Sequence, residues 1–263
     1  MAVPVVHAEE LAAWVGTLLW PFARIGMMLL VMPVFGGRLV PRRVRILLAL
    51  FITLLLIPLL PPVPAVEPLS PAGLLLLGQQ LLIGAAMGLV LQVVFSAMVV
   101  GGQLVGMSMG LGFAMMVDPQ NGINVPVISQ YYVTLASLLF LALDGHLALL
   151  SVLAGSFHTL PIAPLGIGPG SLRQIAEWGG EMFAGGVLIS LPVVTALLLA
   201  NLTFGVITRA APQLNIFAVG FPATLALGFV VILFALPGFL PQFSHLVENA
   251  FGYLRYLTGA GHG

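Results

Sequence analysis

The sequence contains no cysteine and no lysine, and charged residues of either sign are few. Without cysteine the chain can form no disulfide, no thiolate metal site and no cysteine nucleophile. Only 6% of its 263 residues are charged, against roughly 25% in soluble domains. The eight arginines and the eight acidic residues balance, so a polyanion-binding surface is not indicated and nucleic acid is not an expected partner.

Apolar residues are abundant instead, at 60% of the chain, and the mean hydropathy is +1.16. Because a membrane-spanning helix needs about 20 apolar residues, the sequence predicts an all-α integral membrane protein. We expect about six long hydrophobic helices, some broken, in a single membrane-embedded domain over residues 1–263. The candidate segments are Leu11–Val34, Val44–Leu60, Gly73–Val100, Val127–Leu153, Met182–Thr208 and Ile216–Leu236.

Half of the basic residues lie in the loop between the first two segments, at Arg38, Arg42, Arg43 and Arg45. The positive-inside rule places such a loop in the cytoplasm. With six spans, the loop at Arg209 returns to the same side, so the two arginine-bearing loops agree.

The stretch over residues 101–130 is unlike an ordinary span, because it combines glycines, methionines, an Asp-Pro step and an Asn-Gly step. Backbone that leaves the helix at membrane depth is tolerated only where protein buries it or where it lines a cavity. The sequence therefore predicts an irregular loop inside a protein-lined passage.

Six methionines cluster in and before this stretch: Met87, Met98, Met107, Met109, Met115 and Met116. Methionine is unbranched and adapts to changing shapes, as a deformable seal requires, although for any single methionine apolar packing is the better explanation. Together with Phe113 and the neighbouring glycines, the cluster favours an apolar plug.

Small residues recur at intervals of four, first at Gly84 and Gly88, and then at Gly102, Gly106 and Gly110. Such spacing lets helix backbones approach closely in lipid. The pattern fits packing within this chain and packing against another subunit equally well.

Residues 106–110 match the G-x-S-x-G motif, with Ser108 in the place of a nucleophile. A nucleophile elbow needs a strand before the serine, and none is predicted here. The five histidines show no metal-binding spacing. We therefore expect no catalytic residue, no metal and no cofactor. Asp144 could mark a proton relay, but the following glycine favours a helix end.

Three passages resemble the FliR family of flagellar export-gate proteins. They are GLGFAMMVDPQNGINVPVISQ (110–130), LLFLALDGHLALL (138–150) and NLTFGVITRAAPQLNIFAVGFP (201–222). The similarity covers nearly the whole chain, and residues 209–222 are its most specific part. The ending Gly220-Phe221-Pro222 is more similar to the flagellar branch than to the injectisome relatives.

The resemblance implies roles for two groups of residues. A pore plug corresponds to Gly110, Leu111, Gly112, Phe113, Ala114, Met115 and Met116, with a terminating turn at Asp118 and Pro119. An assembly and helix-breaking signature corresponds to Arg209, Pro212, Gln213, Asn215, Gly220 and Pro222.

The resemblance also implies a subunit without enzymatic activity in the type III export gate of the bacterial inner membrane, within the flagellar basal body. Together with FliP-like and FliQ-like subunits, the chain would form a helical cone that is partly raised out of the bilayer. Unfolded export substrates would pass through this cone. FlhB-like and FlhA-like export components and membrane lipid would be further partners. The alternatives are an injectisome subunit, a self-contained transporter using Asp118, Asp144 and Arg209, and an intramembrane serine hydrolase using Ser108.

Overall fold

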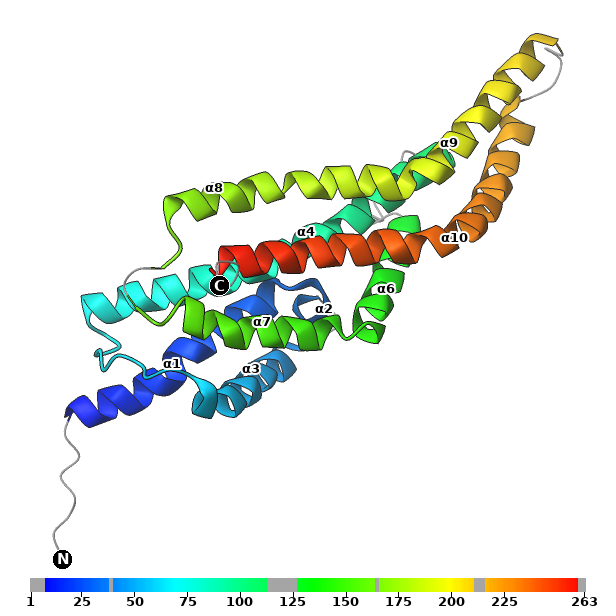
Figure 1. Cartoon of the computed structure of the whole chain (residues 1–263). Coiled ribbons are helices and arrows are strands. Elements are labelled where there is room, and N and C mark those ends of the chain that lie inside the picture. The colour runs from blue at the N-terminus through cyan, green and yellow to red at the C-terminus, as the bar shows by residue number, and fades with distance from the viewer. Residues whose placement is uncertain (1–7, 38–39, 113–126, 164–165, 211–215, 260–263) are drawn as a thin grey trace, which may run out of the picture. The chain divides into compact units, whose positions relative to one another are not determined.

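The computed structural model describes residues 8–37, 40–112, 127–163, 166–210 and 216–259, and within these ranges the chain is helical without strands (Figure 1). The α-helices are α1 (Ala8–Val31), α2 (Pro33–Gly36), α3 (Arg42–Leu56), α4 (Pro71–Ser108), α6 (Val127–Ala142), α7 (Gly145–Thr159), α8 (Pro169–Trp178), α9 (Gly180–Ala210) and α10 (Ile216–Leu257), and the 3₁₀-helix η1 covers Ile57–Leu59. The predicted all-α fold is confirmed.

Three helices in the described ranges are long and apolar enough to cross a membrane, namely those over Pro71–Ser108, Gly170–Ala210 and Gly220–Leu257. A fourth span results if α6 and α7 count as one broken span. All six predicted segments fall on apolar helices, but the number that can span by length is three or four. The second segment falls short because α3 has only 15 residues and three of its first four are arginines.

Helix α10 is much longer than predicted, because it continues from Leu236 to Leu257 through Pro237. Proline removes one backbone hydrogen bond and usually ends or kinks a helix. Beyond it, the fully buried ring of Phe243 packs edge-on against Phe95, with 6.0 Å between the ring centroids. Aromatic packing within the protein thus favours the helix where the local sequence favours a break.

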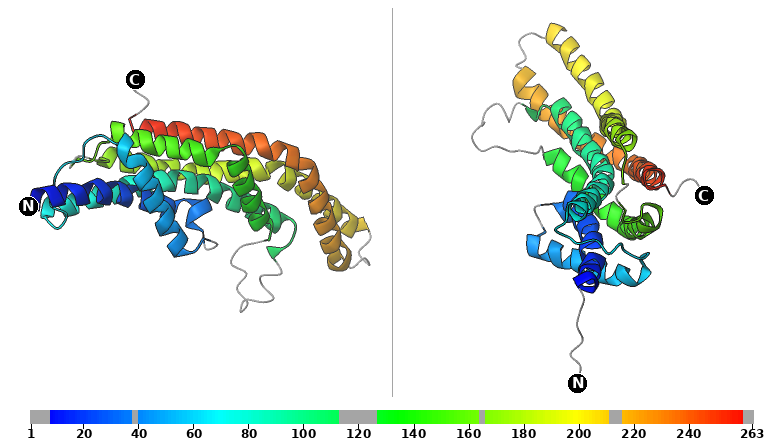
Figure 2. Two further views of the ribbon diagram at one scale, coloured as in Figure 1. Left: turned by 90° about the horizontal axis from the view of Figure 1, so that it is seen from below. Right: turned by 90° about the vertical axis from the view of Figure 1, so that its left-hand side faces the viewer.

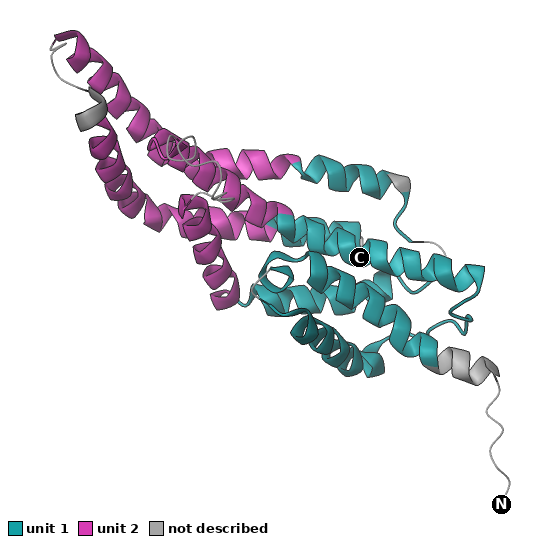
Figure 3. Cartoon of the chain, turned by 180° about the vertical axis from the view of Figure 1, so that it is seen from behind, with its two compact units in different colours: residues 1–92, 144–179, 249–263 teal, residues 93–143, 180–248 magenta. Residues whose placement is uncertain are grey.

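The chain divides into two compact units (Figure 3). Unit 1 contains residues 1–92, 144–179 and 249–263, and unit 2 contains residues 93–143 and 180–248. Helices α4 and α10 each contribute residues to both units.

In unit 1, α1 lies beside α3 and crosses α4 closely (Figures 1 and 2). A Cβ on Gly84 would overlap the carbonyl oxygen of Arg24 and would lie 3.1 Å from the nitrogen of Met28. A Cβ on Gly88 would lie 2.8 Å from the Cβ of Val31. This first glycine pair therefore serves packing within the chain.

Arg24 of α1 is completely buried in unit 1. Its Nε donates to Oε1 of Gln80 (2.8 Å), its Nη1 donates to the carbonyl oxygen of Ser156 (3.0 Å), and its Nη2 donates to the carbonyl oxygen of Leu160 (2.8 Å). The guanidinium also lies over the ring of Phe157, 4.2 Å from its centroid. Carbonyls in the last turn of a helix lack partners and attract cations, so Arg24 caps the end of α7.

Arg45 has a similar role at the end of α2. Its Nε donates to the carbonyl oxygen of Phe35 (2.9 Å), and its Nη2 donates to those of Gly36 (3.0 Å) and Gly37 (3.1 Å). One arginine of the predicted cytoplasmic loop thus fixes the shape of that loop.

In unit 2, α4 packs against α6 and α9 through glycine. A Cβ on Gly102 would overlap the backbone of Ser129, whose Oγ donates to the carbonyl oxygen of Val99 (2.9 Å). A Cβ on Gly101 would lie 3.0 Å from the carbonyl oxygen of Gly186. Gly102 therefore also serves packing within this chain.

Candidate functional site

The last turn of α4 ends in a Schellman motif. The amide of Gly110 donates to the carbonyl oxygen of Met107, and the amide of Leu111 donates to that of Gly106, both at 3.0 Å. Gly110 has a φ of +85°, the left-handed conformation that this motif requires and that glycine adopts without a steric penalty. The glycine thus sets the direction in which the chain leaves α4.

This geometry also explains the G-x-S-x-G match. Ser108 is the last residue of α4, and its Oγ donates back to the carbonyl oxygen of Leu104 (2.8 Å). A nucleophile elbow would require a strand before the serine, whereas here a 38-residue helix precedes it. The motif is a helix end.

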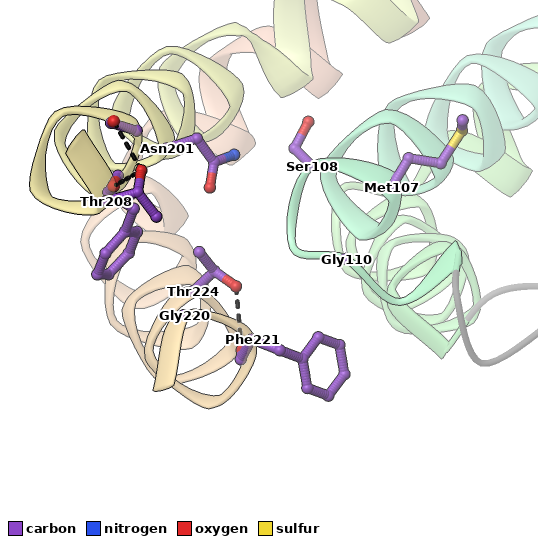
Figure 4. A pocket seen from close by; sticks show the side chains of 10 residues that line it. Met107, Ser108, Gly110, Asn201, Thr208, Gly220, Phe221 and Thr224 are labelled. Carbon is purple, nitrogen blue, oxygen red and sulfur yellow. Dashed lines mark hydrogen bonds between the residues drawn. The ribbon is translucent and has the colours of Figure 1, made fainter. Parts of the chain in front are cut away.

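A pocket of about 620 Å³ lies beside this turn in unit 2 (Figure 4). Three helices line it with Met107, Ser108, Gly110, Asn201, Phe204, Gly205, Thr208, Gly220, Phe221 and Thr224. Asn201 and Ser108 face it from opposite sides (Figure 4). The Oγ1 of Thr208 donates to the carbonyl oxygen of Gly205 (2.7 Å) and that of Thr224 to the carbonyl oxygen of Phe221 (3.0 Å). Since both hydroxyls are bonded to their own helices, the lining is largely apolar.

Two contacts join the end of α4 to α10 within unit 2. A Cβ on Gly110 would lie 3.2 Å from Cδ2 and 3.3 Å from Cε2 of Phe221, so the ring lies directly against this turn. The side chain of Met109 is fully buried and fills the space above Gly228, where a Cβ would lie 2.6 Å from its Cγ. Without these contacts the turn would lose its support from α10.

The predicted plug is described in its first part. Gly110, Leu111 and Gly112 follow α4 and are half-buried, and Gly110 lines the pocket. The remaining predicted plug residues and its terminating turn lie outside the described residues: Phe113, Ala114, Met115, Met116, Asp118 and Pro119.

The predicted assembly signature is also described in part. Gly220 is buried and lines the same pocket, whereas Pro222 is exposed within α10 and Arg209 is exposed in the last turn of α9. Pro212, Gln213 and Asn215 lie outside the described residues. The structure thus brings the start of the predicted plug and one glycine of the predicted signature to a single pocket.

Sequence reasoning did not single out Asn201, Phe204, Thr208, Phe221 or Thr224 as pocket residues. Four of them lie in the passage over residues 201–222, which carried the family resemblance. That passage was the available signal, but it did not indicate which side chains share a pocket with α4.

The methionine cluster has two roles in the described part of the chain. Met87, Met98 and Met109 are fully buried and pack the core of this chain. Met107 is 69% exposed and lines the pocket, where it remains a candidate for apolar closure.

Asp144 lies between α6 and α7 with a φ of +55°, and its carbonyl oxygen accepts from the amides of Leu147 (2.9 Å) and Ala148 (3.0 Å). Its position agrees with the helix-end interpretation. The described residues contain no group of three or more His, Cys, Asp or Glu that could hold a metal ion.

Comparison with known proteins identifies the family. Residues 15–250 match the family described as "Bacterial export proteins, family 1". The flagellar biosynthetic protein FliR of Pectobacterium carotovorum is 42% identical over 94% of this chain and 95% of its own length. FliR of Escherichia coli K12 is 38% identical over 95% of both chains. FliR of Bacillus subtilis is 31% identical over 81% of this chain and 83% of its own length.

These relatives are flagellar proteins, and their family is one of export proteins and not of enzymes. The agreement extends over nearly the whole chain and includes both passages that form the pocket. The chain belongs to the FliR family of bacterial export proteins.

Proposed function

We propose that this chain is a structural and gating subunit of the flagellar type III protein export channel, in the basal body at the bacterial inner membrane. The observation that carries the proposal is the pocket that Gly110, at the start of the predicted plug, lines together with Gly220 of the predicted signature and its neighbour Phe221. The whole chain would act as one membrane-embedded domain.

The gate would close sterically. A hydrophobic constriction excludes water and ions by dewetting, and the predicted plug over residues 110–116 is apolar. An unfolded export substrate would displace it. The largely apolar lining of the pocket, at the point where the chain leaves α4, supports this assignment.

Partner subunits similar to FliP and FliQ would cover the exposed apolar surfaces, and contacts with FlhB-like and FlhA-like components would follow at the edge of the assembly. Only 33% of the apolar stretch of α9 and 22% of that of α10 is buried. Lipid can cover such apolar surfaces as well as partner subunits can. Their exposure therefore supports a membrane location and is compatible with contacts to partner subunits.

Co-purification tests the assembly. A tagged copy of this chain, extracted in mild detergent from cells that express all the export genes, should bring FliP-like and FliQ-like proteins in a fixed ratio. Intact mass measurement gives that ratio directly. Recovery of the chain alone, or only as a homo-oligomer, would refute the gate assignment.

Deletion of Gly110–Met116 tests the plug. We expect the assembled gate to leak small ions, because the apolar closure is removed while the pocket walls on α9 and α10 remain. The measurement is the conductance of the purified complex in planar bilayers. Gly155→Ala is the control, because this residue of α7 lies outside the predicted plug and a Cβ there meets no atom of the described residues within 4 Å. It should leave the leak at the wild-type level. An intact complex that lacks the segment and still does not leak would exclude the plug.

A further inference from the structure

We propose that Phe221 is the positioning residue that holds the turn where the chain leaves α4, and that it thereby controls the proposed plug. The inference rests on the proposed gating function and extends it to a residue outside both predicted groups. It links the start of α10 to the behaviour of a segment that begins more than 100 residues earlier.

The described residues give the turn at Gly110 few supports. Its left-handed conformation is closed by two backbone hydrogen bonds, from the amides of Gly110 and Leu111. Beyond Gly110, a Cβ on Gly112 would meet nothing within 4 Å. The ring of Phe221 is the neighbour that lies against Gly110, and Figure 4 shows it extending from α10 toward the end of α4.

The absence of a side chain at Gly110 makes this contact possible. A Cβ at this position would lie closer to the ring than nearly all ordinary Cβ contacts. Glycine is therefore required at this residue for the positive φ, and it also lets the ring approach this closely.

Phe221 differs from the neighbouring contact made by Met109. Met109 is fully buried against Gly228 and belongs to the core, so we expect it to stay in place whenever unit 2 is folded. Phe221 is 39% exposed at the edge of the pocket, so its ring can leave Gly110 without opening the core. The Gly110–Phe221 contact is thus the one whose loss would release the turn alone.

Hydrogen exchange of the assembled complex tests the contact independently of gating. In Phe221→Ala, peptides covering residues 107–112 should exchange about tenfold faster, because local opening of the turn becomes easier. Peptides covering residues 93–105 should not change. Phe221→Tyr keeps the ring and should restore wild-type exchange. Exchange at residues 107–112 that is unchanged in Phe221→Ala would overturn the proposal.

Conductance of the same complexes tests the consequence. Phe221→Ala should leak more than wild type and less than the complex lacking Gly110–Met116. Phe229→Ala is the matched control, because Phe229 lies on α10 in the same unit, is 57% exposed and does not line the pocket. It should leave both exchange and leak unchanged.

The outcomes separate the two proposals. If the deletion leaks and Phe221→Ala loosens the turn without leaking, the control by Phe221 is refuted and the plug stands. If the deletion itself does not leak, the gating function fails, and the exchange result alone decides whether Phe221 holds the turn.

Discussion

Replacing Gly84 with valine should prevent the chain from accumulating in its folded form. A Cβ at this position overlaps the carbonyl oxygen of Arg24 and lies 3.0 Å from the carbonyl carbon of the same residue. Both atoms belong to the backbone of α1, so no side-chain rotation relieves the overlap and the two helices must separate. Overpacking of a core typically lowers the free energy of unfolding by about 1–3 kcal/mol. Because two helix backbones must separate here, we expect a loss at or above the upper end of that range.

The matched control is Gly78→Val on the same helix, where a Cβ meets nothing within 4 Å. We expect this variant to be recovered at the wild-type level. Size-exclusion chromatography of a fluorescent fusion measures the folded yield of both variants. Equal yields of the two would show that α1 does not approach α4 at Gly84.

Replacing Arg24 with methionine should be comparably severe. The change removes the donors for Oε1 of Gln80 and for the carbonyl oxygens of Ser156 and Leu160. The carbonyl oxygen of Ser156 keeps the amide of Leu160 as a donor (2.9 Å), so two acceptors lose the arginine without this compensation, namely Oε1 of Gln80 and the carbonyl oxygen of Leu160. Each buried polar group left without a partner costs about 1–3 kcal/mol, so we expect a loss of roughly 2–6 kcal/mol in the free energy of unfolding. Thermal unfolding of the detergent-solubilised protein measures the effect.

Arg24→Lys should restore only part of the stability, because an ammonium group cannot present the planar fork that reaches three acceptors at once. The control is Arg173→Met, which removes an exposed ion pair with Glu177 on α8 and should change the unfolding temperature little. Equal unfolding temperatures for Arg24→Met and wild type would contradict the capping role.

The sequence predicted the helical class and the position of each apolar segment, because a run of apolar residues can be recognised without knowing which residues pack against it. It predicted less well where helices end. At Pro237 the local signal favours a break, and the buried ring of Phe243 decides otherwise. At Gly110 the local signal was ambiguous, since the same glycine belongs to a small-residue series, to the G-x-S-x-G match and to the predicted plug, and the structure shows a helix end there.

Contacts between residues far apart in the chain could not be predicted from the sequence. Arg24 interrupts an apolar helix, but nothing near it in the sequence indicates that its acceptors lie 132 and 136 residues later. The approach of Phe221 to Gly110 is equally non-local. The residues that line the pocket come from three helices, and their pairing depends on packing that one sequence alone does not specify.

The capping role of Arg24 also has a consequence for the order of events during synthesis. Its acceptor Ser156 is translated 132 residues after Arg24, and at about 5–20 residues per second this interval is roughly 7–26 s. Throughout it, the guanidinium of α1 lacks both α7 acceptors and has Oε1 of Gln80 as an acceptor only once α4 has been made, and an incompletely paired cation is costly inside a membrane. The first helix can therefore take its final position only after α7 has left the ribosome, and until then it must remain near water or beside the insertion machinery.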